Sequence, residues 1–118
     1  MSREHKYRAI PTTVNGIRFA SKIEATRYQQ LLLLQRAGHV KEIELQPEFL
    51  LQEAFVYKGK TEKPIKYKAD FKITYPDGRV IYEDVKGYKT KEFARTRKLL
   101  LYRYRDIEFR VTSKGGTE

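Results

Sequence analysis

The stretch Pro76-Asp77-Gly78 constrains the fold of this chain more than any other, because alternating apolar and polar residues lie on both sides of it. In a three-residue hairpin loop built on a type I turn, Pro takes the second turn position and Gly takes the left-handed bulge position. Residues 65–75 and 79–86 are therefore predicted to form two antiparallel strands. If Tyr75 pairs with Arg79, Asp70 lies opposite Asp84.

The same register and alternation predict which other side chains lie together. Lys68 is expected opposite Lys86, and Asp84 is expected on one face of its strand with Glu83 on the other. One face of the first strand is predicted to hold Ile65, Tyr67, Ala69, Phe71, Ile73 and Tyr75, and the other face the polar residues between them.

Two carboxylates that face each other across a sheet destabilise it unless something compensates their charge. Mg²⁺ would compensate it, because this ion is usually held by one or two carboxylates together with water and phosphate. Lys86 would then lie close enough to orient or help deprotonate an attacking water. In the alternative interpretation, Asp70 and Asp84 are solvated strand residues that pair with nearby lysines.

The remaining sequence predicts short strands and two helices. An Asn15-Gly16 pair indicates a type I′ hairpin, and Ser21 is a suitable N-cap for a helix from Lys22 to Ala37. Thr90 is a suitable cap for a second helix that ends near Tyr104. The other expected segments are strands at 40–45, 49–52 and 107–112, a break at Gln46-Pro47, a polar loop at 58–64 and a loose tail at 113–118. Together these elements predict an α/β fold with a mixed central sheet of about four or five strands flanked by helices.

Length and composition limit the possible classes of protein. The 118 residues suit a single domain, 1–118, in which segments 1–10 and 113–118 are expected to be flexible. There is no cysteine, which excludes disulfides and thiolate metal sites. No apolar run is long enough to cross a bilayer, so a soluble protein in the cytoplasm without a membrane partner is expected. The 25 Lys and Arg against 15 Asp and Glu favour a polyanionic partner such as nucleic acid.

Several phrases of the sequence resemble known nucleases. "YKADF" at 67–71, followed by Asp84-Val85-Lys86, resembles the PD-(D/E)xK nuclease signature, with Ala69 where the motif name has Pro. Glu24 in the first helix resembles the additional acidic residue of archaeal-type Holliday junction resolvases. The phrases "FASKIEATRYQQL", "LQPEFLL", "YKADF" and "YEDVKGYKT" are further similar to a family of small phage-encoded, resolvase-like nucleases.

This resemblance implies a restriction-endonuclease-like core and a Mg²⁺-dependent endonuclease, with Mn²⁺ able to substitute. It also implies a homodimer that acts on branched DNA, including four-way junctions. Asp70 and Asp84 would be metal ligands, the Val85 carbonyl a possible third ligand, and Lys86 the catalytic lysine. Glu24 would complete the metal site.

Some roles stay open at this point. Ser21 and Glu24 also have the spacing of a capping box, in which the glutamate bonds back to the helix start. Gln46 is a secondary candidate near the metal, and a strand-end glutamine bonded to backbone is an equal alternative. The candidate phosphate-binding residues are Lys68, Lys72, Lys89, Lys91, Arg95 and Lys98. Two other functions share these features: a restriction-type or nonspecific nuclease, and a basic DNA-binding protein without catalysis.

Overall fold

The structure, a computed structural model, describes residues 10–87, 89–113 and 116–117. A mixed five-stranded sheet forms its centre, in the order β11-β10-β9-β8-β3. Strands β9 and β10 are parallel, whereas the other neighbours are antiparallel. The bounds of these strands are β3 (Glu42–Leu45), β8 (Phe71–Thr74), β9 (Val80–Val85), β10 (Phe109–Ser113) and β11 (Gly116–Thr117).

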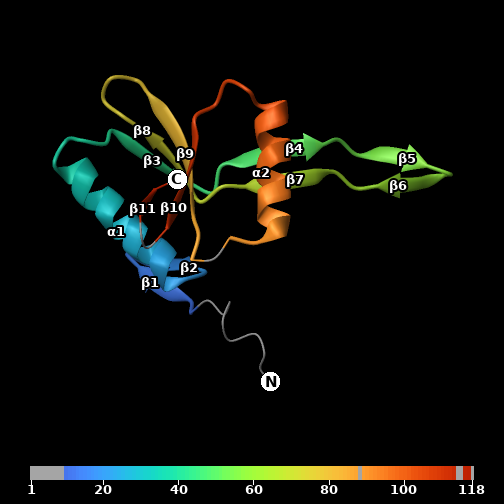
Figure 1. Cartoon of the computed structure of the whole chain (residues 1–118). Helices are drawn as coiled ribbons and strands as arrows, with labels where there is room; N and C mark the ends of the chain where they lie inside the picture. The colour runs from blue at the N-terminus through green and yellow to red at the C-terminus, as the bar shows by residue number, and fades with distance from the viewer. Residues whose placement is uncertain (1–9, 88, 114–115, 118) are drawn as a thin grey trace.

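Helices α1 (Lys22–Arg36) and α2 (Lys91–Arg103) lie on opposite sides of this sheet (Figure 1). The side chain of Ser21 caps α1 and that of Thr90 caps α2, and each accepts a backbone N–H three residues on. Residues packed on the α1 side include Phe19, Ala25, Leu31, Phe71 and Ile73. Residues packed on the α2 side include Phe49, Ala69, Tyr82 and Leu100. The predicted α/β class and both helices are confirmed.

The hairpin predicted at Pro76-Asp77-Gly78 is present in the predicted register. The Tyr75 N–H donates to the Arg79 carbonyl at 2.8 Å, and Gly78 has the positive φ of 93° that the bulge position requires. Strands β8 and β9 pair from Thr74 opposite Val80 to Phe71 opposite Glu83. Turn chemistry therefore set the register over the whole of β8.

The first strand of this hairpin does not continue to residue 65 as predicted. The chain bends at Ala69-Asp70, and the preceding strand β7 (Ile65–Lys68) pairs with β4 (Glu48–Gln52), which places Lys68 opposite Glu48. The prediction that Lys68 faces Lys86 is thus wrong. The physical reason is that the Asp70 N–H donates to the Asp84 side chain at 2.9 Å and to the Glu83 carbonyl at 3.1 Å, which ends the regular ladder.

The bend also changes which side chains share a face. Tyr67 and Ala69 pack on the α2 side, whereas Phe71 and Ile73 pack on the α1 side. The prediction that the apolar residues of 65–75 share one face is therefore wrong, because the rotation of the chain at Asp70 exchanges its two faces.

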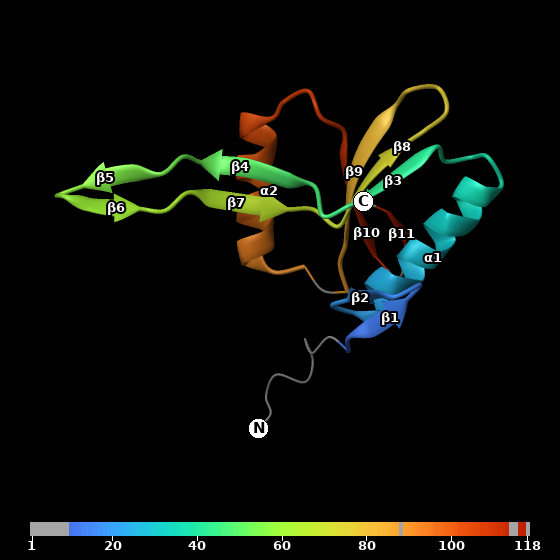
Figure 2. The ribbon, with the colours of Figure 1, turned by 180° about the vertical axis from the view of Figure 1, so that it is seen from behind.

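Residues 58–64, predicted to be a polar loop, contain the turn and one strand of a second hairpin. Strands β5 (Phe55–Tyr57) and β6 (Lys60–Glu62) pair around Lys58 and Gly59, both with positive φ. A Lys-Gly pair in this conformation makes a two-residue hairpin loop. Strands β4, β5, β6 and β7 together form a two-stranded ribbon, here called the arm (residues 48–68), that projects past α2 (Figures 1 and 2).

The hairpin at the N-terminal end of the described chain was predicted correctly, whereas the strand at its C-terminal end was not. Strands β1 (Thr12–Val14) and β2 (Ile17–Phe19) form the hairpin expected at Asn15-Gly16, with positive φ at both turn residues. At the other end, β11 pairs with β10, so residues 116–117 do not belong to a loose tail. The flexibility expected of 1–9, 114–115 and 118 lies outside the described residues. Neither described helix combines the length and apolar character that a membrane span requires.

Candidate metal and catalytic site

The bend at Asp70 brings its side chain to the end of β9. The Asp70 N–H donates to Asp84 Oδ1 at 2.9 Å, and the Val85 N–H donates to Asp70 Oδ2 at 2.7 Å. Asp84 is 1% exposed. Each carboxylate therefore accepts a backbone N–H from the other strand, and the two acids lie side by side although Asp70 is outside the regular ladder.

Glu24 joins these two acids from the first turn of α1. Its backbone N–H is capped by Ser21 Oγ at 3.1 Å, while its carboxyl group shares a hydrogen bond with Asp70. The side chain of Glu24 is thus directed to the acids on the sheet. Only the Ser21 half of the predicted capping box is present among the described residues, because the Glu24 carboxyl group contacts Asp70 and does not bond back to the Ser21 N–H.

Burial changes the protonation of all three acids. Burial, with the charges of Asp70 and Asp84 added, raises the pKa of Glu24 to about 7. Burial also raises the pKa of Asp70, although the Val85 N–H opposes this shift. The pKa of Asp84 is raised to about 6 by burial, against the effect of Lys86. At neutral pH, Glu24 and Asp70 can hold a proton between them.

Lys86 lies at the edge of this group of acids. Its Nζ is 3.9 Å from Asp84 Oδ2 and 4.4 Å from the centre of the Phe93 ring. The ring face attracts the ammonium group and fixes its direction. As an apolar residue of the second helix, Phe93 is expected from the sequence only to pack in the core. The available signal was its place three residues after the Thr90 cap, on a helix that starts just after Lys86.

The oxygen atoms of this site are ligands of the kind that a hard divalent cation prefers. Asp84 Oδ2 is buried and has no hydrogen-bond partner among the described residues, so this oxygen could bind a cation without losing a hydrogen bond. No three Asp, Glu, His or Cys side chains in the part of the chain that the structure describes are already arranged around one point. Metal binding would require Glu24 and Asp70 to lose any proton that they share. The three carboxylates and the Val85 carbonyl fit Mg²⁺ in chemistry once deprotonated.

A pocket of about 160 Å³ opens next to the acids. Glu24 and Asp70 line it together with Gln46, whose N–H donates to the Asp70 carbonyl at 3.0 Å. Gln46 has a positive φ of 52°, an uncommon backbone state for this residue type that is often found at functional sites. Arg18 of β2 also lines the pocket and is exposed, and no sequence pattern indicates this role for it.

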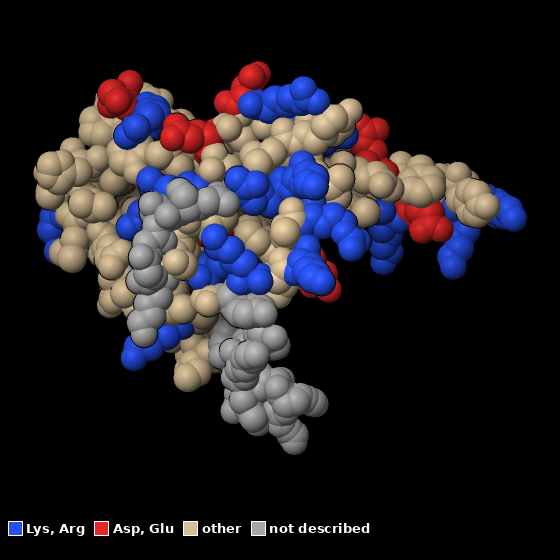
Figure 3. All heavy atoms as spheres, in the orientation of Figure 1, with Lys and Arg blue, Asp and Glu red and all other residues tan. Residues whose placement is uncertain are grey.

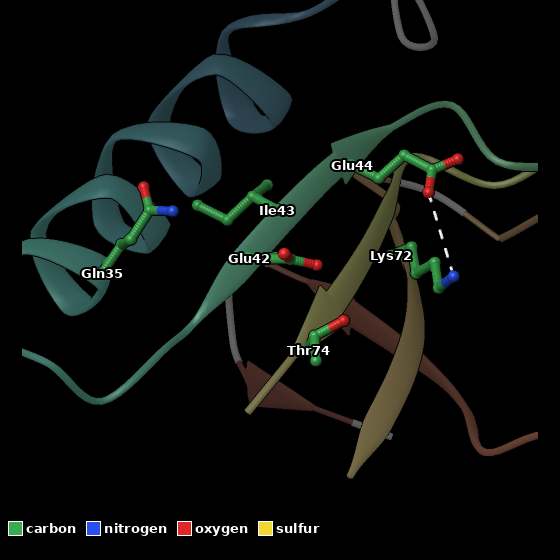
Figure 4. Close-up of a pocket in the computed structure, with 6 residues that line it drawn as sticks. All are labelled: Gln35, Glu42, Ile43, Glu44, Lys72 and Thr74. Carbon is green, nitrogen blue, oxygen red and sulfur yellow. Dashed lines mark ion pairs between the residues drawn. The ribbon is translucent and has the colours of Figure 1, made fainter. Parts of the chain in front are cut away.

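The candidate phosphate-binding residues fall into two groups. Lys89, Lys91, Arg95 and Lys98 are exposed at the start and along α2, and Lys68 is exposed on the arm. Lys72 is different, because its Nζ lies 3.9 Å from Glu44 Oε1 in a pocket that also holds Glu42 (Figure 4). Nearby acids compensate its charge, so the structure does not group Lys72 with the other cations.

The raised pKa values predict that the metal-free protein loses stability as pH rises. Between about pH 4.5 and pH 7, folded Glu24 keeps a proton that the unfolded chain has released. The stability that this proton supplies is complete below pH 4.5 and is lost as pH rises through about 7. Thermal unfolding in EDTA should therefore shift down by several degrees between pH 5 and pH 8, and Mg²⁺ should reverse the shift at pH 8.

Two variants check this pH dependence. Glu24→Gln should make it shallower, with a residual slope from Asp84, whose pKa is raised to about 6. Glu92→Gln, at an exposed position in the first turn of α2, should leave it as in the wild type. An equal slope in the wild type and Glu24→Gln would show that Glu24 is not the group that titrates.

Comparisons with known proteins give a family but no activity. No curated protein matches the chain. Residues 4–115 match the family model described as "Protein of unknown function (DUF1064)". Because this match covers nearly the whole sequence, from before β1 to the end of β10, the chain belongs to the DUF1064 family.

Proposed function

We propose that this protein is a Mg²⁺-dependent endodeoxyribonuclease that cuts branched DNA, above all four-way junctions. The observation that carries the proposal is the group of three acids next to Lys86, in which Glu24 and Asp84 are buried and Asp70, at the bend before β8, is half-buried. Buried carboxylates are costly unless they are paired, protonated or bound to metal. The presence of such a group of acids in a chain with formal net charge +10 therefore supports a functional role for them.

The roles of the residues follow from their positions. Glu24, Asp70, Asp84 and the Val85 carbonyl would hold the cation. When bound, Mg²⁺ supplies a Lewis acid that offsets negative charge on the phosphodiester and lowers the pKa of a coordinated water. Lys86, directed by Phe93, would orient the attacking water and stabilise negative charge on the phosphate. Gln46 and Arg18 line the approach on the α1 side.

The basic surface supports DNA as the substrate. Lys and Arg side chains gather over α2 and along the arm (Figure 3). Contacts from such residues to phosphates position a duplex without reading its bases, which suits recognition by shape. Symmetric cutting of a four-way junction requires two sites related by a two-fold axis, so the proposed active form is a homodimer.

A cleavage assay tests the proposal. Four-way junction, flap and linear DNA are incubated with the protein in Mg²⁺, Mn²⁺ or EDTA, and sedimentation gives the oligomeric state. Metal-dependent cutting that is fastest on the junction, by a dimer, is expected. Equal cutting of linear DNA would instead favour a restriction-type or nonspecific nuclease. Tight binding without cutting in either metal would favour a non-catalytic DNA-binding protein.

A further inference from the structure

The arm (residues 48–68) extends large apolar side chains into solvent. In β5, Phe55, Val56 and Tyr57 are 47%, 67% and 58% exposed, and Ile65 in β7 is 50% exposed. A two-stranded ribbon by itself is only marginally stable in water. Exposed apolar side chains grouped in this way are typical of an interaction surface. The arm thus has the character of an element that binds a partner.

The charges of the arm favour nucleic acid as that partner. Its five lysines outnumber its three glutamates, and blue side chains follow its lower edge in Figure 3. Two of the glutamates are engaged, since Glu48 lies 3.9 Å from Lys66 Nζ and Glu53 lies 3.6 Å from Arg103 of α2. The tip carries Lys58 and Lys60 on either side of Gly59. A lysine-rich tip with exposed aromatic side chains suits phosphates and the groove surface between them.

The position of the arm relates it to the candidate site. Strand β7 leads through Ala69 to Asp70. The hydroxyl of Tyr104, the C-cap residue of α2, donates to the Leu50 carbonyl at 2.8 Å and accepts from the Leu50 N–H at 3.2 Å. At about 3.3 Å per residue, the tip at Gly59 lies roughly 35 Å along the ribbon from Asp70. One turn of B-DNA is about 34 to 36 Å long, and its major groove is wide enough for a two-stranded ribbon.

We propose that the arm is a second DNA contact, which follows a duplex outward from the cutting site for about one helical turn. This inference rests on the proposed nuclease function. Tyr57 and Lys60 are directly paired, so they share a face that would lie against the duplex. DNA is favoured over a second copy of this chain, because the lysines of two arms would repel each other.

The test compares junctions with long and short duplex arms. Four-way junctions with arms of about 16 or about 6 base pairs are bound in EDTA, so that no cutting occurs, and affinity is measured by fluorescence anisotropy. Wild type should bind the long-armed junction at least about tenfold more tightly. The variant Lys58→Glu/Lys60→Glu/Lys63→Glu should lose this preference and bind the two junctions alike.

A matched control carries the same change of charge elsewhere. Arg36→Glu/Lys41→Glu/Arg79→Glu alters three exposed residues near the C-terminal end of α1 and the β8–β9 turn, and should keep the wild-type preference. Retention of the preference by the arm variant would overturn the proposal. So would loss of self-association by that variant with its DNA affinity unchanged, because the arm would then be a subunit contact.

Failure of the arm proposal and failure of the nuclease proposal are distinguishable. Binding is measured without metal, whereas cutting is measured separately with Mg²⁺. A wild type that prefers long arms but never cuts would refute the nuclease and leave the arm contact in place. Wild-type protein that cuts junctions with no dependence on the length of their duplex arms would refute the contact by residues 48–68 and leave the nuclease proposal in place.

Discussion

Asp84→Asn should reduce the rate of DNA cleavage by about three orders of magnitude or more while leaving DNA affinity close to that of the wild type. The amide oxygen can still accept the Asp70 N–H that Asp84 Oδ1 accepts now. The amide nitrogen would then replace Asp84 Oδ2, the buried oxygen with no partner among the described residues. A hydrogen-bond donor at that position cannot bind a cation. Single-turnover cleavage of a four-way junction in Mg²⁺ measures the loss.

Asp77→Asn is the matched control, since it makes the same chemical change on the same hairpin at an exposed turn residue. It should cut at the wild-type rate. Thermal unfolding of both variants separates a lost ligand from a lost fold. If Asp84→Asn is folded and cuts as fast as Asp77→Asn, the acids at the bend are not a catalytic site.

The parts of the fold that the sequence predicted well are those governed by local chemistry. Pro76 to Gly78 set the hairpin register, and Ser21 and Thr90 each began a helix. These signals act over a few residues, because a turn or a cap is satisfied by its immediate neighbours. The same local rules placed Asp70 beside Asp84 without any knowledge of the rest of the chain.

The predictions failed where the backbone pairs or forms hydrogen bonds with residues that are distant in the sequence. Alternation predicted one strand over 65–75, but the pairing of β7 with β4 and the side chain of Asp84 divide it at Asp70. The turn of the arm was missed because Lys58 holds a positive φ that its residue type seldom adopts. The phosphate contact of Lys72 stays a prediction, and its 3.9 Å contact with Glu44 of the neighbouring strand β3 is one that the local sequence does not indicate.

The most consequential feature that sequence reasoning missed is the environment of Glu83. It was predicted to face away from Asp84, as it does, and received no role. Its side chain is fully buried, and two arginines bind it: Arg27 of α1 at 2.6 and 3.0 Å, and Arg110 of β10 at 2.8 and 3.1 Å. Nothing in the local sequence pairs residues so far apart. Through Arg27, which lies one turn after Glu24, these three residues connect α1 to the sheet.

Glu83→Gln should lower the free energy of unfolding by about 3 kcal/mol, because it leaves two guanidinium groups facing a neutral amide in a buried position. The value lies at the low end for a broken buried pair, since the Arg27 and Arg110 side chains keep 16% and 25% of their surface exposed. Urea unfolding followed by circular dichroism measures it. Glu44→Gln is the control, as its pair with Lys72 is largely exposed and should contribute less than about 1 kcal/mol. Equal losses in the two variants would mean that the buried arginines gain nothing from the charge of Glu83, and that apolar packing alone holds α1 on the sheet.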